Sequence, residues 1–310
     1  MGAKRESAAA PIPATAEPLV SIYMPTRNRC DLLQRAVTSV LAQDHAALEL
    51  IVVNDGSTDG TAAFLDDIAR TDERVRVIHR PEGKGAPAAR NEAIRQSRGH
   101  FVTGLDDDDF FAVDRISSFV AAWARLEGQS QRPACLYSQT MEIRDGTQRQ
   151  SRRPEFVRFE NLFVQNTIGN QIFAPRETFL RAGLFDETLP AWQDLDFFIR
   201  VLRDGGVAFL LDKATYLYDD YDRGDRISAN PKRIRQAWEI VSKKYNSTIS
   251  QAEFHLFMQM FNGYYDVYPR WPDFRYAMAK GMNFDQFVSL LKMTLKSRWK
   301  ATARFKAVAA

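Results

Sequence analysis

Between residues 19 and 105 the sequence alternates short apolar runs with amphipathic runs, and this alternation constrains the fold more than any other feature of the chain. Four apolar runs have the length and composition of buried strands, at 19–24, 48–53, 74–78 and 101–105. The stretches between them carry apolar residues at helical spacing, which predicts helices at 32–41, 62–68 and 86–96. Strands that alternate with helices are typical of a mainly parallel sheet flanked by helices. The sequence therefore predicts an α/β fold.

A polar motif follows three of the predicted strands. These motifs are Pro25-Thr26-Arg27-Asn28, Asn54-Asp55-Gly56-Ser57 and the acidic run Asp106-Asp107-Asp108-Asp109. In open α/β sheets ligands bind at the carboxyl ends of the strands, so we expect the three motifs to share one site. Each motif taken separately is also good turn chemistry.

The acidic run places four consecutive carboxylates directly after a strand. Like charges this close raise one another's pKa unless something positive lies among them. A divalent cation that bridges to a diphosphate would relieve the repulsion, because hard cations prefer carboxylate oxygen. A solvated acidic turn is the alternative for this run alone.

Other motifs supply groups that a nucleotide needs. Asp55 can accept a hydrogen bond from a base or a ribose hydroxyl, while Asn28 and Arg29 can meet ribose or phosphate. Gly83-Lys84-Gly85 and Arg90-Asn91 supply flexible backbone and two cations for a diphosphate. The glycines match neither a Walker motif nor a dinucleotide-binding fingerprint.

Composition excludes several classes of protein. With 45% hydrophobic residues in 310, the chain is typical of soluble globular proteins, and a net charge of +3 gives no argument for nucleic acid. No apolar run approaches the roughly 18 residues of a membrane span, and 1–18 lacks the apolar region of a secretory signal. Cys30 and Cys135 have neither metal-ligand spacing nor a disulfide framework, so we expect a cytoplasmic protein.

The second half of the chain is less regular. Strands are predicted at 134–143, 171–174, 207–211 and 214–218. After Asn230-Pro231 the pattern becomes mostly helical, which predicts a boundary there. We expect a flexible tail at 1–18, a main domain at 19–230 divided at 110/111, and a helical C-terminal region at 231–310.

Four segments, in this order, resemble glycosyltransferase family two, whose members have the GT-A fold: VSIYMPTRNRCDLLQRAVTSVLAQ, ELIVVNDGSTDGT, GKGAPAARNEAI and GHFVTGLDDDD. The resemblance is specific from residue 20 to about residue 109 and continues more weakly to about residue 228. It implies inverting transfer of a sugar from a nucleotide donor, usually UDP-linked, with Mg²⁺ or Mn²⁺ as cofactor. It also implies that 19–110 binds the nucleotide and 111–230 the acceptor.

The resemblance assigns donor-binding roles by position. It places Pro25, Arg27 and Asn28 along the nucleotide and Asp55 against the base. Arg27 departs from the Tyr that is common at its position, so a guanidinium would stack on the base in place of a phenol ring. The segment that flanks the diphosphate and the sugar contains Lys84, Arg90 and Asn91.

Within the acidic run, the resemblance makes Asp106 and Asp108 the outer carboxylates of an Asp-x-Asp metal motif, with Asp108 as the direct ligand. Asp107 is expected to contact the sugar or the ribose, and Asp109 to cap the following helix. A divalent cation here would stabilise the negative charge of the departing nucleoside diphosphate. No His-Glu-x-x-His or paired Cys/His cluster in the sequence offers a zinc alternative.

Inversion in one displacement requires a base for the acceptor hydroxyl. Asp194 matches the base in the family's Glu-Asp motif, although Gln193 replaces the Glu. The alternative is that Asp194 is a helix N-cap, and Asp196 is the second candidate for the base. Trp192 would stack on an acceptor sugar or simply pack in the core.

Two later segments carry further expectations. The loop at 218–228 matches the position of a mobile loop that closes over the donor in this family, which would bring Arg223 or Arg226 to the diphosphate. Residues 284–306 form a basic amphipathic pattern. Such a helix lies on an anionic membrane surface or docks its apolar face on the protein's own helices.

The sequence therefore predicts a metal-dependent inverting glycosyltransferase. Its donor is expected to be a UDP-sugar and its acceptor a hydroxyl of a glycan or a lipid-linked glycan, in bacterial surface polysaccharide synthesis at the inner face of the cytoplasmic membrane. One alternative is a sugar-nucleotide nucleotidyltransferase, which would need a Gly-rich basic loop after the first strand. The other is a non-catalytic nucleotide-sugar-binding scaffold, which Gln193 favours.

Overall fold

The computed structural model describes residues 17–129, 133–144, 146–169, 171–219, 230–249, 251–262, 264–265 and 267–295. These residues form two compact units. The first unit contains the described residues of 17–162, 167–187 and 193–221, and the second contains those of 163–166, 188–192 and 222–295.

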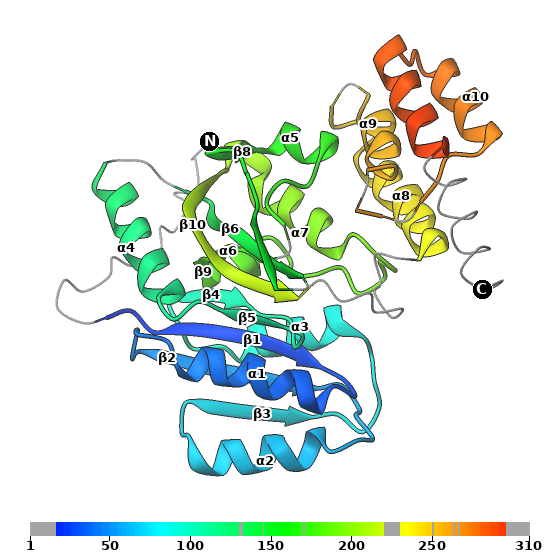
Figure 1. The fold of residues 1–310 in the computed structure, drawn as a ribbon. Helices are drawn as coiled ribbons and strands as arrows, with labels where there is room; N and C mark the ends of the chain where they lie inside the picture. The colour runs from blue at the N-terminus through cyan, green and yellow to red at the C-terminus, as the bar shows by residue number, and fades with distance from the viewer. Residues whose placement is uncertain are drawn as a thin grey trace, which may run out of the picture. The chain divides into compact units, whose positions relative to one another are not determined.

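The first unit is built on a five-stranded sheet with the strand order β3-β2-β1-β4-β9 (Figure 1). Four strands run parallel: β1 (Val20–Thr26), β2 (Leu48–Asn54), β3 (Val75–His79) and β4 (Phe101–Gly104). The short strand β9 (Ala174–Pro175) pairs with β4 in the antiparallel direction. Every residue of β1 and β2 is buried, as expected for strands covered on both faces. The predicted mainly parallel sheet is confirmed.

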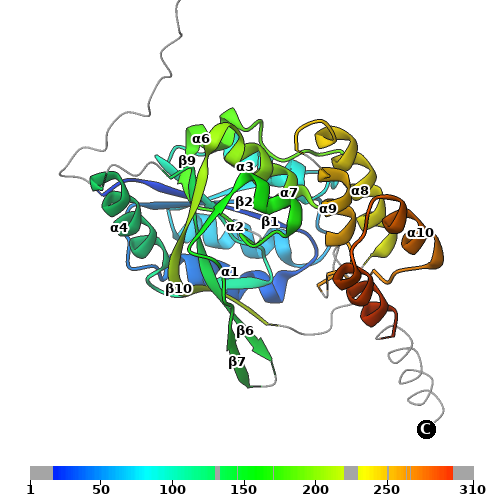
Figure 2. The same cartoon turned by 90° about the horizontal axis from the view of Figure 1, so that it is seen from above.

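Three helices connect the parallel strands, namely α1 (Cys30–Leu41), α2 (Thr61–Thr71) and α3 (Ala86–Gln96). The chain runs from β1 outward to β3 and then returns past β1 to β4. Because crossovers of this kind are right-handed, the reversal puts α3 on the opposite face of the sheet from α1, as Figure 2 shows. The carboxyl ends of β1 and β4 therefore flank the switch point where ligands bind in open α/β sheets.

A second sheet in the first unit has the order β5-β10-β6-β7. The long strand β10 (Val207–Asp219) runs parallel to β6 (Cys135–Arg144) and antiparallel to β5 (Asp109–Phe111). Two further strands, β7 (Thr147–Gln150) and β8 (Phe156–Arg158), pair with β6 and β10. The prediction of separate strands at 207–211 and 214–218 is wrong, because β10 continues through two register shifts between Leu211 and Tyr216 that mark β-bulges.

The remaining helices up to residue 205 are α4 (Arg115–Gly128), α5 (Phe159–Val164), α6 (Arg176–Arg181), α7 (Gln193–Leu202) and a 3₁₀ turn at Arg203–Gly205. An aromatic cluster packs α4 against the first sheet. The Phe173 ring lies 4.6 Å from the Phe101 ring of β4 and 5.0 Å from the Phe119 ring of α4, stacked on both. Rings packed this way bury a large apolar area and fix the edge of the sheet.

The second unit is helical, with α8 (Pro231–Tyr245), α9 (Ala252–Gln259), α10 (Trp271–Ala279) and a helix at 284–295. The predicted helical C-terminal region is therefore confirmed. Asn230 caps α8, since its side chain accepts hydrogen bonds from Lys232 N and Arg233 N. None of the described helices combines the length and the apolar composition that crossing a bilayer requires.

Candidate active site

Asp55 follows β2 and is only 3% exposed. Its Oδ1 accepts hydrogen bonds from Arg80 Nη1 and Lys84 N, both at 2.9 Å, and its Oδ2 accepts from Gly85 N at 2.7 Å. Burial raises the pKa of Asp55, but these donors outweigh it and hold the pKa below its usual value. Asp55 therefore fixes the Gly83-Lys84-Gly85 loop beside the end of β2.

Arg27 lies against the same loop. A β-carbon added to Gly83 would come 2.7 Å from Arg27 Nη1 and 2.8 Å from the Asp55 carbonyl oxygen, so glycine is required at this close approach. The Arg27 side chain is exposed, as is that of Lys84. The structure thus brings together three of the residues that the sequence predicts to bind the donor.

Asn28 ties the ends of β1 and β2 to each other. Its backbone N donates a hydrogen bond to Ser57 Oγ at 2.9 Å, and its side-chain Oδ1 accepts one from the backbone N of Thr58 at 2.7 Å. It adopts a left-handed conformation with φ of 54°, which Asn tolerates better than most residues. Pro25 is buried within β1. The loops that follow the two strands are therefore held in one arrangement.

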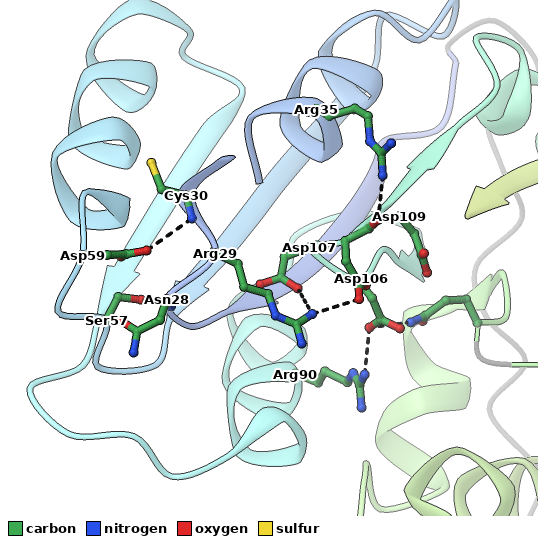
Figure 3. A network of polar contacts seen from close by, with 12 residues as sticks. Asn28, Arg29, Cys30, Arg35, Ser57, Asp59, Arg90, Asp106, Asp107 and Asp109 are labelled. Atoms are coloured by element: carbon green, nitrogen blue, oxygen red, sulfur yellow. Dashed lines mark hydrogen bonds and ion pairs between the residues drawn. The ribbon is translucent and has the colours of Figure 1, made fainter. Parts of the chain in front are cut away.

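Three arginines approach the acidic run from different sides (Figure 3). Arg29 Nη1 lies 3.2 Å from Asp107 Oδ1 and 2.9 Å from Asp108 Oδ2. Arg90 Nη2 lies 2.8 Å from Asp106 Oδ1, and Arg35 Nη2 donates to the Asp108 carbonyl oxygen at 2.8 Å. The protein's own cations thus balance part of the negative charge that the sequence concentrates here.

Asp106 is also held by neutral groups. Gln171 Nε2 donates to Asp106 Oδ1 at 3.3 Å, and the Tyr23 hydroxyl donates to Gln171 Oε1 at 2.6 Å. The backbone N of Asp106 donates to Tyr216 Oη at 3.4 Å. Gly104 makes this possible, because a β-carbon there would collide with Gln171 and Tyr23. The absence of a side chain at Gly104 therefore lets Gln171 and Tyr23 lie close to the start of the acidic run.

Asp109 does not cap the following helix, so that prediction is wrong. It begins β5, and its Oδ2 accepts a hydrogen bond from Tyr216 Oη at 2.7 Å. Helix α4 begins later, at Arg115, with Asp114 at the N-cap position. Asp109 therefore anchors the acidic run to β10 through Tyr216.

Asp107 is the most buried of the four carboxylates, at 7% exposure. Burial raises its pKa to about 6, which the charge of Arg29 opposes and those of Asp108 and Asp106 reinforce. The proton equilibrium of Asp107 thus depends on its burial and on the charges of its neighbours.

The outer two carboxylates are the candidates for holding a divalent cation. The Asp106 and Asp108 side chains are 23% and 24% exposed, so both keep contact with solvent. Among the described residues, no three His, Cys, Asp or Glu side chains form a complete cage for a metal ion. Mg²⁺ is usually held by one or two carboxylates together with substrate phosphates, and the two part-exposed aspartates suit that arrangement.

Asp194 is the second residue of α7, inside the helix and not at its N-cap. Burial raises its pKa to about 6. The backbone N–H of Leu195 and the charge of Arg90 oppose this shift, while the charge of Asp106 adds to it. Asp194 therefore lies within the electrostatic field of the Arg90–Asp106 pair.

The residues around Asp194 have structural partners. Asp196, the second candidate for the base, is fully buried and forms an ion pair with Arg200 at 2.8 Å. Gln193, which stands in the place of the family's Glu, is 9% exposed. Trp192 is 3% exposed, with its ring 6.0 Å from that of Tyr265, so it packs within the second unit.

Asn91 holds a loop. Its Nδ2 donates to the Phe185 carbonyl oxygen and to Glu187 Oε1, both at 2.8 Å, and its Oδ1 accepts from Phe185 N at 2.8 Å. The side chain is 2% exposed. These bonds use both hydrogens of the Asn91 side-chain amide, so its contact with the nucleotide-sugar donor stays a prediction.

Sequence reasoning missed several residues of this site, namely Tyr23, Arg35, Gln171 and Tyr216. Arg35, Gln171 and Tyr216 hydrogen-bond to the acidic run, and Tyr23 reaches it through Gln171. Tyr23 and Arg35 lie in the first of the four family-like segments, but nothing in that segment indicates these contacts. The need for positive charge near four carboxylates is a signal for Arg35, but it gives none for the three uncharged side chains. Arg223, Arg226 and residues 296–306 lie outside the described residues.

Comparison with known proteins identifies the family of this chain. The family description "Glycosyl transferase family 2" matches residues 21–187. WcaA of Escherichia coli (strain K12), named as a glycosyl transferase of colanic acid biosynthesis, is 34% identical over 239 residues, which are 74% of this chain and 85% of WcaA. TuaG of Bacillus subtilis (strain 168), named for teichuronic acid biosynthesis, is 30% identical over 72% of this chain and 86% of TuaG.

Solved structures share the fold. S. aureus TarS 1-349 in complex with UDP-GlcNAc superposes with a TM-score of 0.60 at 16% identity, over 89% of this chain and 79% of TarS. The mannosyltransferase PcManGT from Pyrobaculum calidifontis, in complex with GDP-Man and Mn²⁺, superposes with a TM-score of 0.58 at 18% identity. The match covers 94% of this chain and 84% of PcManGT. The family match spans more than half of the chain, and WcaA is similar over most of its length. The chain therefore belongs to glycosyl transferase family 2 and is a glycosyltransferase with the GT-A fold.

Proposed function

We propose that this glycosyltransferase transfers a sugar, with inversion, from a UDP-linked donor to a hydroxyl of a glycan or a lipid-linked glycan. The observation that carries the proposal is the buried carboxylate of Asp194, in the first turn of α7 and within the electrostatic field of the Arg90–Asp106 ion pair, whose atoms lie 2.8 Å apart. Burial raises the pKa of Asp194 to about 6. A general base is most effective when its pKa lies near the working pH. Asp194 meets that requirement beside the switch point of the sheet.

The nucleotide would lie across the carboxyl ends of β1 and β2. Arg27 offers a guanidinium face for the base, and Asn28 and Asp55 hold the two loops that would enclose it. The TarS structure with UDP-GlcNAc supports a UDP-linked donor, whereas PcManGT holds GDP-Man. A donor screen therefore has to include both bases.

Asp106 and Asp108 would hold Mg²⁺ or Mn²⁺ together with the diphosphate, and the cation would supply charge stabilisation for the leaving group. Arg90 and Arg29 orient these two carboxylates through contacts of 2.8 and 2.9 Å. Lys84 presents an exposed side chain from the loop that Asp55 fixes, and it would reach the diphosphate. Asp107 would contact the ribose or the sugar.

The reaction would be a single displacement at the anomeric carbon. The acceptor hydroxyl attacks from the side opposite the diphosphate, and Asp194 accepts its proton as the new glycosidic bond forms. The bond between the anomeric carbon and the diphosphate oxygen breaks, and UDP leaves with the electron pair. The anomeric configuration of the transferred sugar is inverted.

Surface polysaccharide synthesis would be the cellular context. WcaA is named for colanic acid biosynthesis and TuaG for teichuronic acid biosynthesis, and both are at least 30% identical over most of their length. We infer that the acceptor is a growing bacterial polysaccharide or its lipid-linked precursor.

A donor screen tests the proposal. The full chain is incubated with Mn²⁺, a panel of UDP- and GDP-sugars and glycan acceptors, and release of the nucleoside diphosphate is measured. We expect release from a UDP-sugar, with a product whose anomeric configuration is opposite to that of the donor. Tight UDP binding without release from any donor would contradict the proposal.

That last outcome would favour a non-catalytic nucleotide-sugar-binding scaffold, to which Gln193 points because it replaces the family's Glu. A nucleotidyltransferase would instead release pyrophosphate from UTP and a sugar phosphate. The segment at the end of β1, Pro25-Thr26-Arg27-Asn28, lacks the glycines that such an enzyme would need.

A further inference from the structure

The last described helix, at 284–295, presents an apolar face to solvent. Phe284, Leu291 and Leu295 are 78%, 42% and 57% exposed. At 3.6 residues per turn these three side chains project from one narrow stripe of the helix. Leu290, at 1% exposure, projects from a different side and packs within the second unit. The helix thus buries one apolar side, while Phe284, Leu291 and Leu295 form a second apolar side that the described residues leave exposed.

Helix α10 packs against this helix through Phe274 and also exposes apolar side chains. Trp271 and Met278 are 72% and 52% exposed, and their spacing of seven residues puts them on one face of α10. The Phe274 ring lies 6.4 Å from the ring of Trp271 and 5.8 Å from that of Phe287, which joins the two helices. Figure 1 shows α10 beside the red helix that follows it. The apolar surface formed by these exposed side chains is called the 271–295 face, and its members are Trp271, Met278, Phe284, Leu291 and Leu295.

Residues 271–295 carry three basic residues, Arg275, Lys280 and Lys292, and two acidic ones, Asp285 and Asp273, of which Asp273 pairs with Arg235 at 2.8 Å. Arg275 lies one turn after Trp271 and Lys292 follows Leu291, and both are exposed. The sequence beyond Asp285 contains no Asp or Glu, and its charged residues are Lys292, Lys296, Arg298, Lys300, Arg304 and Lys306. A second copy of this chain would bring like charges together, whereas an anionic surface would complement them.

We propose that the 271–295 face docks on a bilayer surface that contains anionic phospholipids. Exposed Trp, Phe and Leu side chains beside Lys and Arg are what an interfacial helix uses, with the apolar face at the headgroup boundary and the cations over anionic headgroups. Docking here is independent of the transfer reaction, and it would hold the enzyme where lipid-linked substrates lie.

Vesicle sedimentation of the full chain tests this proposal. We expect binding to phosphatidylglycerol–phosphatidylcholine vesicles, weaker binding in high salt, and little binding to phosphatidylcholine alone. The double variant Phe284→Ser/Leu291→Ser and the double variant Arg275→Glu/Lys292→Glu should each lower binding by about tenfold or more. Matched controls carry two exposed changes each in the first unit, Val113→Ser/Phe156→Ser and Arg125→Glu/Arg149→Glu, and should bind as wild type.

Three results would overturn the proposal. They are absence of vesicle binding by the wild type, unchanged binding by both double variants, and equal binding to neutral and anionic vesicles. A dimer in analytical ultracentrifugation that Phe284→Ser/Leu291→Ser abolishes would assign the face to a second copy instead. UDP release with a soluble acceptor, measured on the same variants, separates failure of this proposal from failure of the proposed function.

Discussion

The guanidinium of Arg90 lies 2.8 Å from the carboxylate of Asp106 and joins α3 to the end of β4. Burial alone would lower the pKa of Arg90, but the negative charge of Asp106 outweighs it and raises the pKa. Asp194 lies in the field of both groups. This one ion pair therefore connects the carboxylate expected at the metal to the carboxylate expected to act as base.

Replacing Arg90 should lower both the stability of the protein and its affinity for UDP with Mn²⁺. Arg90→Met removes the charge-assisted bond to Asp106, so we expect a loss of about 1–3 kcal/mol in the free energy of unfolding and at least tenfold weaker binding of UDP with Mn²⁺. Thermal unfolding and titration calorimetry measure the two effects. Arg95→Met is the control, because Arg95 lies on the same helix with 58% of its side chain exposed. Equal behaviour of the two variants would contradict this account.

Gly104 is predicted to be intolerant of even one methyl group. In Gly104→Ala the new β-carbon would collide with Gln171 and Tyr23, which hold Asp106, and we expect about 1–3 kcal/mol of destabilisation with a clear loss of transfer. Gly128→Ala provides the control, since nothing lies within 4 Å of a β-carbon there. Wild-type stability and activity in Gly104→Ala would show that the Asp106 contacts are not needed.

The rate of transfer should depend on pH through Asp194. A base must be ionised, and burial raises the pKa of Asp194 to about 6, so kcat/KM should fall about tenfold per pH unit below that value and level off near neutrality. A pH profile of kcat/KM with Mn²⁺ and a fixed donor measures this limb. A flat profile from pH 5 to pH 8 would exclude a base with this pKa.

Asp108 is expected to act through the metal. Asp108→Ala should weaken binding of UDP in the presence of Mn²⁺ by about tenfold and leave metal-free UDP binding nearly unchanged. Binding is measured with and without a chelator. Asp31→Ala, an exposed carboxylate on α1, should change neither value. Retention of full metal dependence in Asp108→Ala would rule out its role as a ligand.

The first half of the fold could be predicted because each element there carries a strong local signal. Helix α3 occupies 86–96 as predicted, since Gly85 precedes it, Pro87 sits in its first turn and alanines fill its buried face. The second half offered weaker signals. The polar pair Asp212-Lys213 predicts a break between two strands, but in the structure β10 continues through it with β-bulges. Strands of three or four residues, such as β5 and β8, show no usable periodicity.

The candidate site divides in the same way. Asp55, Arg27 and Asn28 stand in local motifs, and the structure puts them together at the ends of β1 and β2. The partners of Asp106 could not be predicted, because Gln171 and Tyr216 are 65 and 110 residues away along the chain. Contacts at such separations follow from tertiary packing, which leaves no trace in a single sequence.

The most direct test of the account is Asp194→Asn. An ionised carboxylate with a raised pKa costs folding free energy above about pH 6, so the neutral amide should leave thermal stability at pH 7.5 unchanged or slightly higher. By contrast, Asp196→Asn breaks a buried ion pair and should destabilise the protein by about 3–5 kcal/mol.

The measurement compares transfer with donor binding in the folded Asp194→Asn variant. We expect transfer to fall by about 10²–10⁴-fold while the affinity for UDP with Mn²⁺ stays within about twofold of wild type. Transfer at the wild-type rate, or a loss of UDP binding as large as the loss of transfer, would contradict the assignment of Asp194 as the base.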